Sequence, residues 1–131
     1  MTIKIEWVFL LAAVAVAALA AAVAGANERQ ARWVWVEATA YCPCAICCGK
    51  HANGVTATGR GANTPGVAVD PTVIPLGSRL DIPGYRRSNG TWILADDTGG
   101  AIKGNRIDVR FETHEEARQW GRRRIRVRVW E

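Results

Sequence analysis

Three segments of the chain repeat aliphatic side chains at every second position over at least part of their length, and this pattern constrains the fold more than any other feature. They span residues 31–41, 106–111 and 122–130. A two-residue period predicts β-strands that turn one face toward a core. In residues 106–111 the apolar positions flank Asp108 on either side, so its carboxyl is expected on the opposite face, toward a cavity or solvent.

Shorter apolar segments at residues 66–71, 79–82 and 91–95 predict three further strands. Glycine- and proline-containing turns separate them, as expected for closely spaced strands. The alternating face of residues 122–130 also carries arginines, which suit either a solvated surface or an anionic partner. Five or six short strands joined by such turns predict a small all-β barrel.

One helix is predicted near the C-terminal end. Thr113 is placed to act as its N-cap and Glu116 to reach back to it, which together make a capping box. The helix is expected to run to about Trp120 and to end at Gly121, a residue type that favours helix termination.

An uncharged apolar run covers residues 7–26, follows Lys4 and ends in Ala-Gly-Ala. This layout is typical of a signal peptide with a small-x-small cleavage site or of a membrane anchor, and about 20 apolar residues suffice to span a bilayer. We therefore expect residues 1–26 to direct export to the cell envelope. Contact with the membrane is expected only through this segment, if it is not cleaved.

The remaining chain is long enough for one domain, since roughly 100 residues is a common domain size. We expect a lead-in strand at residues 27–36 and a barrel domain at residues 37–131. The formal charge of +5 favours a polyanionic partner such as nucleic acid, acidic lipid or an acidic wall polymer. Nucleic acid is not expected, because the basic-aromatic motifs of known binders are missing and export argues against it.

Four cysteines lie in one short loop: Cys42, Cys44, Cys47 and Cys48. Outside the cytoplasm we expect such a cluster to form disulfides. A bond between the adjacent Cys47 and Cys48 would be strained, so Cys42 and Cys44 are each expected to pair with one of those two. The alternative is a structural zinc ion held by four thiolates, which is less favoured because a single tight loop would have to wrap the metal alone. A nucleophilic cysteine is not expected.

Residues 95–110 read A-D-D-T-G-G-A-I-K-G-N-R-I-D-V-R and are the candidate site. Asp97 and Asp108 stand near its two ends, with Lys103 and Arg106 between them. Carboxylates and cations beside glycine-rich turns suit proton transfer next to a polar ligand. The alternative is an ordinary surface hairpin, because the same residues favour turns.

Several motifs follow one another in an order that resembles the three-aspartate domain of bacterial cell-wall proteins. Stationary-phase survival proteins, resuscitation-factor-like proteins and the C-terminal part of membrane-bound lytic transglycosylase A carry this domain. The motifs that carry the resemblance are Ala38-Thr39-Ala40-Tyr41, Thr56-Ala57-Thr58-Gly59, Val67-Ala68-Val69-Asp70-Pro71, Ile74-Pro75-Leu76-Gly77-Ser78, the segment from Asp97 to Asp108, and Trp120-Gly121.

The resemblance implies a six-stranded double-psi β-barrel with a groove across it. It also implies that Asp70, Asp97 and Asp108 are the name-giving acids and gather at that groove as the catalytic residues. Asp108 is expected to be the acid/base, with Asp97 as its companion, and Asp97 and Asp70 are expected to orient or tune it. Cys44 and Cys47 reproduce a Cys-x-x-Cys found in relatives, and Asp96 departs from the family pattern. The side chains and turn expected to bind substrate are those of Thr39, Thr98, Gly99, Gly100 and Lys103.

The implied activity is that of a peptidoglycan lytic transglycosylase, which cleaves the β-1,4 bond from N-acetylmuramic acid to N-acetylglucosamine without water. Asp108 would have to be protonated first, and a neighbouring carboxylate would raise its pKa while Lys103 or Arg106 would lower it. The alternatives are a wall-binding barrel without turnover, as among barwin- and expansin-like proteins, and a true hydrolase. No cofactor or metal is expected. A partner protein or a second copy is expected to complete the groove, unless the groove is shallow.

Overall fold

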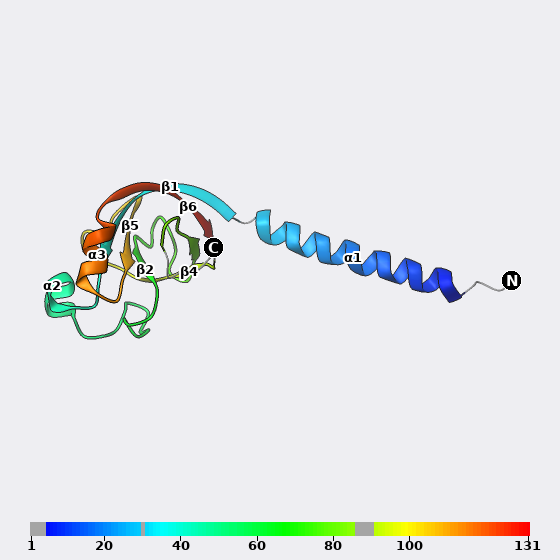
Figure 1. The fold of residues 1–131 in the computed structure, drawn as a ribbon. Helices are drawn as coiled ribbons and strands as arrows, with labels where there is room; N and C mark the ends of the chain where they lie inside the picture. Colours follow the sequence, from blue (N-terminus) through cyan, green and yellow to red (C-terminus); the bar gives the residue numbers. More distant parts are fainter. Residues whose placement is uncertain (1–4, 30, 86–90) are drawn as a thin grey trace. The chain divides into compact units, whose positions relative to one another are not determined.

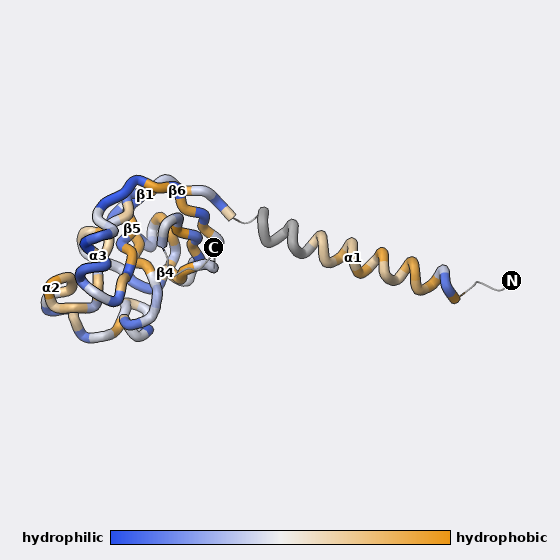
Figure 2. Tube along the Cα trace, in the orientation of Figure 1, coloured by the Kyte–Doolittle hydropathy of each residue, from blue (hydrophilic) through white to orange (hydrophobic). Residues whose placement is uncertain are grey.

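The computed structural model describes residues 5–29, 31–85 and 91–131. It divides into two compact units, and the division falls between Ala31 and Arg32 in the chain. The first contains helix α1, Ile5–Arg29. Within the described residues, α1 is the helix long and apolar enough to cross a membrane, with a mean hydropathy of 2.3 over Ile5–Ala22 (Figure 2). A signal sequence meets the same criterion, so cleavage and anchoring both stay predictions.

The second unit is a closed six-stranded barrel with strand order β1-β5-β2-β4-β3-β6 (Figure 1). This confirms the predicted double-psi β-barrel with one short helix. Each predicted strand forms within about two residues of its expected position, which is the usual uncertainty of element ends. The strands are β1 Ala31–Tyr41, β2 Val67–Val69, β3 Arg79–Asp81, β4 Ile93–Asp97, β5 Arg106–Arg110 and β6 Arg123–Trp130.

Aliphatic side chains from all six strands fill the barrel and form one hydrophobic core. The lead-in strand expected at residues 27–36 is wrong in its bounds, because residues 27–29 belong to α1 and β1 begins at Ala31. Val34 and Val36 belong to the core, so residues 31–36 are part of the barrel wall and not a separate segment before it. Helix α3, His114–Trp120, has the predicted capping box at Thr113 and ends at Gly121 with a positive φ of 66°. Its Trp120 packs against Tyr85 and Phe111 and donates a hydrogen bond to the carbonyl of Ala38 at 3.3 Å.

Trp33 and Trp35 lie on the exposed face of β1, opposite the core valines. The guanidinium groups of Arg126 and Arg124 on β6 lie over their rings, at 4.8 and 5.5 Å from the ring centroids. Cation–π contacts of this kind contribute about 0.5–1 kcal/mol at exposed sites. The arginine side chains of β6 therefore pack against the tryptophan rings of β1.

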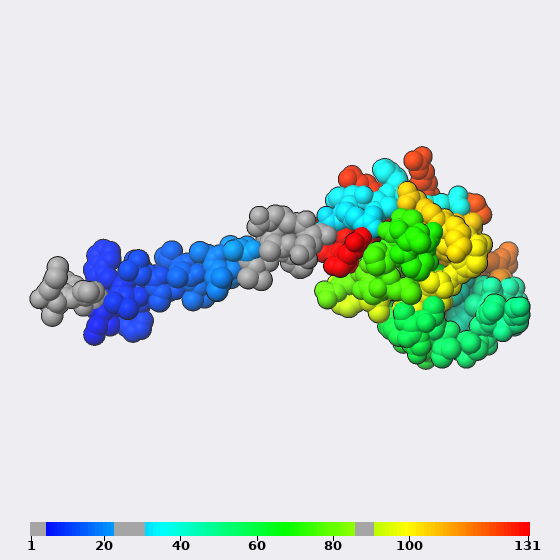
Figure 3. Space-filling view, turned by 180° about the vertical axis from the view of Figure 1, so that it is seen from behind, coloured from blue at the N-terminus to red at the C-terminus, as the bar shows by residue number. Residues whose placement is uncertain are grey.

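The loop between β1 and β2 contains two short helices that the sequence did not predict, α2 Ala45–Cys48 and η1 Gly49–His51. A four-residue helix of mixed apolar and cysteine residues has no periodicity from which to recognise it. Figure 1 shows α2 beside α3, and in Figure 3 the loop (teal) again adjoins α3 (orange, at the right). This loop therefore covers the part of the barrel next to the N-terminus of α3.

Candidate active site

A cavity of about 580 Å³ lies between the β1–β2 loop and the turn that joins β4 to β5. Asp97 and Asp108 both line it, so the structure brings together the two acids that are 11 positions apart in the sequence. Four of the five predicted substrate-binding residues, Thr98, Gly99, Gly100 and Lys103, also line it, whereas Thr39 is not among its lining residues.

Strand register explains why these two acids line the same cavity. Ala68 of β2 pairs with Asp97 of the parallel strand β4 on one side and with Asp108 of the antiparallel strand β5 on the other. Asp108 in turn pairs with Thr39 of β1. Residues paired directly across strands turn their side chains to the same face, so the four form one row on the outer face of the barrel. Two strand spacings, roughly 10 Å, separate the backbones of the two acids, and the small Ala68 between them leaves room for a ligand.

Asp108 is half-buried and accepts a hydrogen bond from the Thr39 hydroxyl at 2.9 Å. Burial raises the pKa of the Asp108 carboxyl, and the nearby charge of Asp97 raises it further. The Thr39 hydrogen bond and the charge of Arg106 act in the opposite direction. The direction agrees with the sequence expectation, but burial is a larger cause than the neighbouring carboxylate.

Three donors hold the Asp97 carboxylate. The Tyr41 hydroxyl donates to one oxygen at 2.7 Å, and the backbone amides of Ala57 and Thr98 donate to the other at 2.9 Å. Sequence reasoning placed Tyr41 in a motif but gave it no part in the site. Its position as the last residue of β1 was the available signal, because strand ends are where side chains reach a site.

Asp70 does not line the cavity, which differs from the predicted gathering of three acids at the groove. Its carboxylate accepts hydrogen bonds from the amide and hydroxyl of Thr72 at 3.0 and 2.8 Å, and from the Gly104 amide at 2.8 Å. These bonds, with that from Gly104 the largest, lower the pKa of Asp70. Asp70 thus holds the backbone next to Lys103 through the Gly104 amide, from outside the cavity lining.

Asp96, the residue that departs from the expected pattern, is fully buried and paired with Arg110, which is also fully buried. Two hydrogen bonds of 2.9 and 2.7 Å join them, and Arg60 reaches the same carboxylate at 2.6 Å. Arg110 also donates to the Tyr41 hydroxyl at 3.1 Å. A chain of hydrogen bonds therefore runs from Asp96 through Arg110 and Tyr41 to Asp97 in the cavity.

Gly66 lies against this buried pair, and the closeness gives a testable consequence. A Cβ atom at this position would stand 2.2 Å from an Arg110 nitrogen and 2.4 Å from an Asp96 oxygen. We expect Gly66→Ala to lower the free energy of unfolding by about 1–3 kcal/mol, the usual range for overpacking, as measured by urea denaturation. Gly100→Ala is the control, because a Cβ there meets open space. Equal stability of the two variants would contradict the close packing of Gly66 against the Asp96–Arg110 pair.

The family comparison agrees with these features. A model of the 3D domain matches residues 66–131, half of the chain. The chain belongs to the 3D domain family. All three aspartates implied by the resemblance lie inside the matched segment, whereas Thr39 and the cysteine loop precede it.

Three proteins of Bacillus subtilis (strain 168) are similar to this 3D domain chain. The putative cell wall shaping protein YabE is 41% identical over 95 residues, which cover 72% of this chain and 22% of YabE. The cell wall-binding protein YocH is 46% identical over 81 residues, 59% of this chain and 26% of YocH. The SPbeta prophage-derived uncharacterized protein YorM is 40% identical over 99 residues, 70% of this chain and 40% of YorM. The chain thus spans less than half the length of each relative.

Among solved structures, MltA from E. coli resembles the chain over 57% of its residues and 26% of MltA, with 28% identity and a TM-score of 0.42.

The structure does not confirm the disulfides predicted for the cysteine loop, since its four cysteines are free thiols. The Cys42 sulfur lies 2.8 Å from that of Cys44 and 3.2 Å from that of Cys47, beyond the roughly 2.05 Å of a disulfide bond. The hydrogen bond from the Cys42 thiol lowers the pKa of Cys44 to about 6, and burial raises the pKa of Cys42 to about 12. Cys48 points elsewhere and contacts the Cys42 carbonyl at 3.3 Å.

Proposed function

We propose that this 3D domain protein acts on peptidoglycan as a lytic transglycosylase, with Asp108 as its general acid and base. The placement of Asp108 carries the proposal: its half-buried carboxyl has a raised pKa and lines the cavity. Asp108 pairs with Thr39 on one side and with Ala68 on the other, and Ala68 in turn pairs with Asp97. The cell-wall names of two relatives and the motif resemblance support peptidoglycan as the substrate.

The proposed reaction needs only one proton-carrying carboxyl. Asp108 donates its proton to the glycosidic oxygen, the C1–O bond breaks, and N-acetylglucosamine leaves with a new hydroxyl. The C6 hydroxyl oxygen of the muramic acid then bonds to C1, and its proton returns to Asp108. An ordinary glycosidase needs a second carboxylate to act as nucleophile or to activate water. Here the substrate supplies the nucleophile, so Asp97 is left to stabilise the positive charge that develops at C1.

The surrounding residues have positioning roles in this proposal. Thr39 orients the Asp108 carboxyl, and Tyr41 with the two backbone amides orients Asp97. Thr98, Gly99, Gly100 and Lys103 lie where sugar hydroxyls and amides would meet the cavity wall. Asp70 accepts a hydrogen bond from the Gly104 amide and so holds the loop that carries Lys103 in place.

Export to the cell envelope through residues 1–26, as a cleaved or an anchored protein, is part of the same proposal. Whether a partner or a second copy completes the groove is tested by comparing activity across protein concentrations. Activity per chain that rises with concentration would indicate self-association, and constant activity would indicate a groove that works alone.

A second candidate is a wall-binding protein without turnover, which the name of one relative favours. The two are separated by incubating the full chain, held in detergent micelles, with purified sacculi. Co-sedimentation together with soluble muropeptides supports the transglycosylase. Co-sedimentation with no release, even at high protein concentration and long times, would favour the binder and contradict the proposed activity.

The pH dependence of activity tests the direction in which two neighbouring charges shift the pKa of Asp108. Activity should fall as the pH rises through the pKa of Asp108, because the acid must start protonated. Asp97→Asn removes a charge that raises this pKa, so the remaining activity should fall off at lower pH. Arg106→Gln removes a charge that lowers it, so the fall should move to higher pH.

The measurement is a pH–rate profile of muropeptide release for the two variants. Arg122→Gln is the matched control for Arg106→Gln, since Arg122 also pairs with Glu37 but is not among the charges that shift the pKa of Asp108. Shifts of the two profiles in the same direction would contradict the role given to Asp108.

A further inference from the structure

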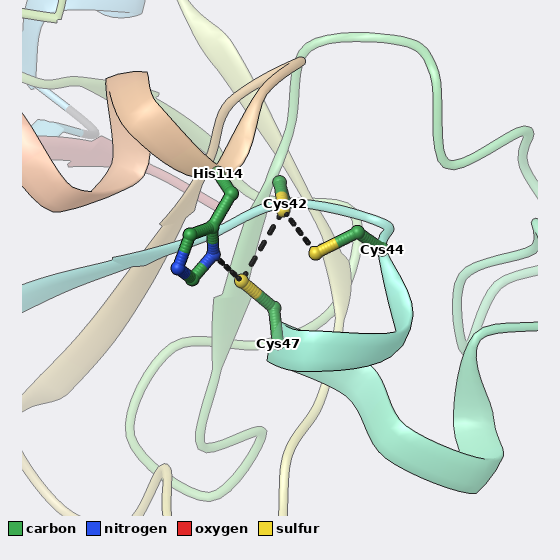
Figure 4. A group of neighbouring side chains, drawn as sticks. All are labelled: Cys42, Cys44, Cys47 and His114. Atoms are coloured by element: carbon green, nitrogen blue, oxygen red, sulfur yellow. Dashed lines mark hydrogen bonds between the residues drawn. The ribbon is translucent and has the colours of Figure 1, made fainter.

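A cluster of metal-binding side chains lies beside the cavity, and the proposed reaction does not use it. It consists of the thiols of Cys42, Cys44 and Cys47 and the imidazole of His114, with all four ligand atoms within 4.8 Å of one another. Figure 4 shows the three sulfurs and the Nδ1 side of the His114 ring converging on a common point. The Nδ1 atom lies 3.3 Å from the Cys47 sulfur.

We propose that Cys42, Cys44, Cys47 and His114 form a structural zinc site. Three thiolates and one imidazole are a common ligand set for four-coordinate Zn²⁺, with Zn–S distances of about 2.3 Å and Zn–N distances of about 2.0–2.1 Å. In a tetrahedron these bonds separate the ligand atoms by roughly 3.5–3.8 Å. The sulfur separations of 2.8 and 3.2 Å and the upper bound of 4.8 Å bracket that value, so small side-chain rotations admit the ion.

The four ligands of this zinc site come from two separate parts of the chain. Zinc was disfavoured because one tight loop would have to surround the metal alone. The fourth ligand comes instead from His114, the first residue of α3, which lies 67 positions beyond Cys47. Cys48 is the thiol left out, since its sulfur turns to the Cys42 carbonyl. The site thus has two separated segments, as structural zinc sites usually have.

The position of the cluster defines what the metal would do. Cys47, Cys48 and His51 line the cavity, so the loop that carries the cluster forms one of its walls. Zinc would fasten this loop to α3, whose start is fixed by the Thr113 capping box. Four protein ligands leave no open coordination position, so the role is structural and the ion does not react with substrate. Binding releases the three thiol protons and leaves His114 neutral.

Metal content of the full chain tests the proposal. The protein is purified in detergent without chelator, its zinc is measured by elemental mass spectrometry, and its thiols are alkylated after unfolding in chelator. We expect about one zinc per chain and four reactive thiols. Fewer than about a tenth of a zinc per chain, together with the mass loss of two hydrogens for each disulfide, would overturn the proposal.

Variants identify the ligands. Cys44→Ser and His114→Ala should each weaken zinc binding by at least about 100-fold, more than loss of a group that only orients a ligand. Cys48→Ser and His51→Ala are the matched controls and should keep the metal. Loss of zinc in Cys48→Ser, or its retention in His114→Ala, would overturn the assigned ligand set.

A spectroscopic measurement on the unmodified chain keeps the test independent of variant folding. Co²⁺ replaces zinc in such sites, and its thiolate charge-transfer absorption reports bound sulfur. We expect a tetrahedral spectrum with three thiolates that disappears when excess Zn²⁺ is added. Hydrogen exchange in residues 42–54 should speed up when the metal is removed. An octahedral cobalt spectrum without sulfur bands would contradict the site.

Discussion

Asp108→Asn should reduce the release of 1,6-anhydro muropeptides from purified sacculi by at least about 1,000-fold. General acid–base catalysis contributes about 10²- to 10⁴-fold in enzymes, and in the proposed reaction one carboxyl performs both proton transfers. Asparagine keeps the size of the side chain and can still accept the hydrogen bond from Thr39. The loss should therefore come from chemistry and not from unfolding or from loss of wall binding.

Asp81→Asn is the matched control, because Asp81 is an exposed aspartate at the end of β3 that does not line the cavity. It should keep full activity. Sedimentation with sacculi and thermal unfolding should be unchanged in both variants. Activity of Asp108→Asn within about tenfold of the unmodified protein would contradict the role of Asp108 as general acid and base.

Breaking the buried ion pair should have the largest effect on stability. Removing one partner of a buried pair costs about 3–5 kcal/mol, because the remaining charge is left without compensation. Asp96→Asn leaves Arg110 buried with a neutral partner, so we expect a loss in that range. The measurement is the free energy of unfolding from urea titrations followed by tryptophan fluorescence.

Arg60→Gln is the control for this prediction, since Arg60 meets the same carboxylate with its side chain 37% exposed. Asp96 keeps Arg110 as its buried partner in this variant, so the loss of stability should be smaller than that of Asp96→Asn. Because Arg110 also holds Tyr41, Asp96→Asn should disturb the hydrogen bond from Tyr41 to Asp97. A cost below about 1 kcal/mol for Asp96→Asn would contradict the structural role of the pair.

The barrel strands could be read from the sequence because alternation and turn residues are local signals. Asp108 could likewise be assigned to the face opposite Ile107 and Val109, which lie in the core. The closure of the barrel is not local, since β2 lies between β4 and β5 through pairings of distant segments. The row that places Ala68 between the two acids therefore appears only in the structure.

Long-range contacts account for the expectations that changed. Asp96 and Asp97 are neighbours in β4, yet one is buried with Arg110 and the other lines the cavity. Nothing in the local pattern distinguishes them, because the partner arginine is 14 positions away. Asp70 also has a motif that suggests a site, but its carboxylate accepts local turn bonds from Thr72 and a long-range bond from the Gly104 amide. The histidine beside the cysteines comes from a different element of the chain altogether.

The most direct test of the proposed function is the mass of the muropeptides that the full chain releases from sacculi in water labelled with heavy oxygen. The account predicts products lighter by one water than ordinary reducing ends, free of the label, and missing when Asp108→Asn replaces the unmodified protein. Reducing ends that carry the label would instead show hydrolysis, and they would contradict attack by the C6 hydroxyl of the substrate.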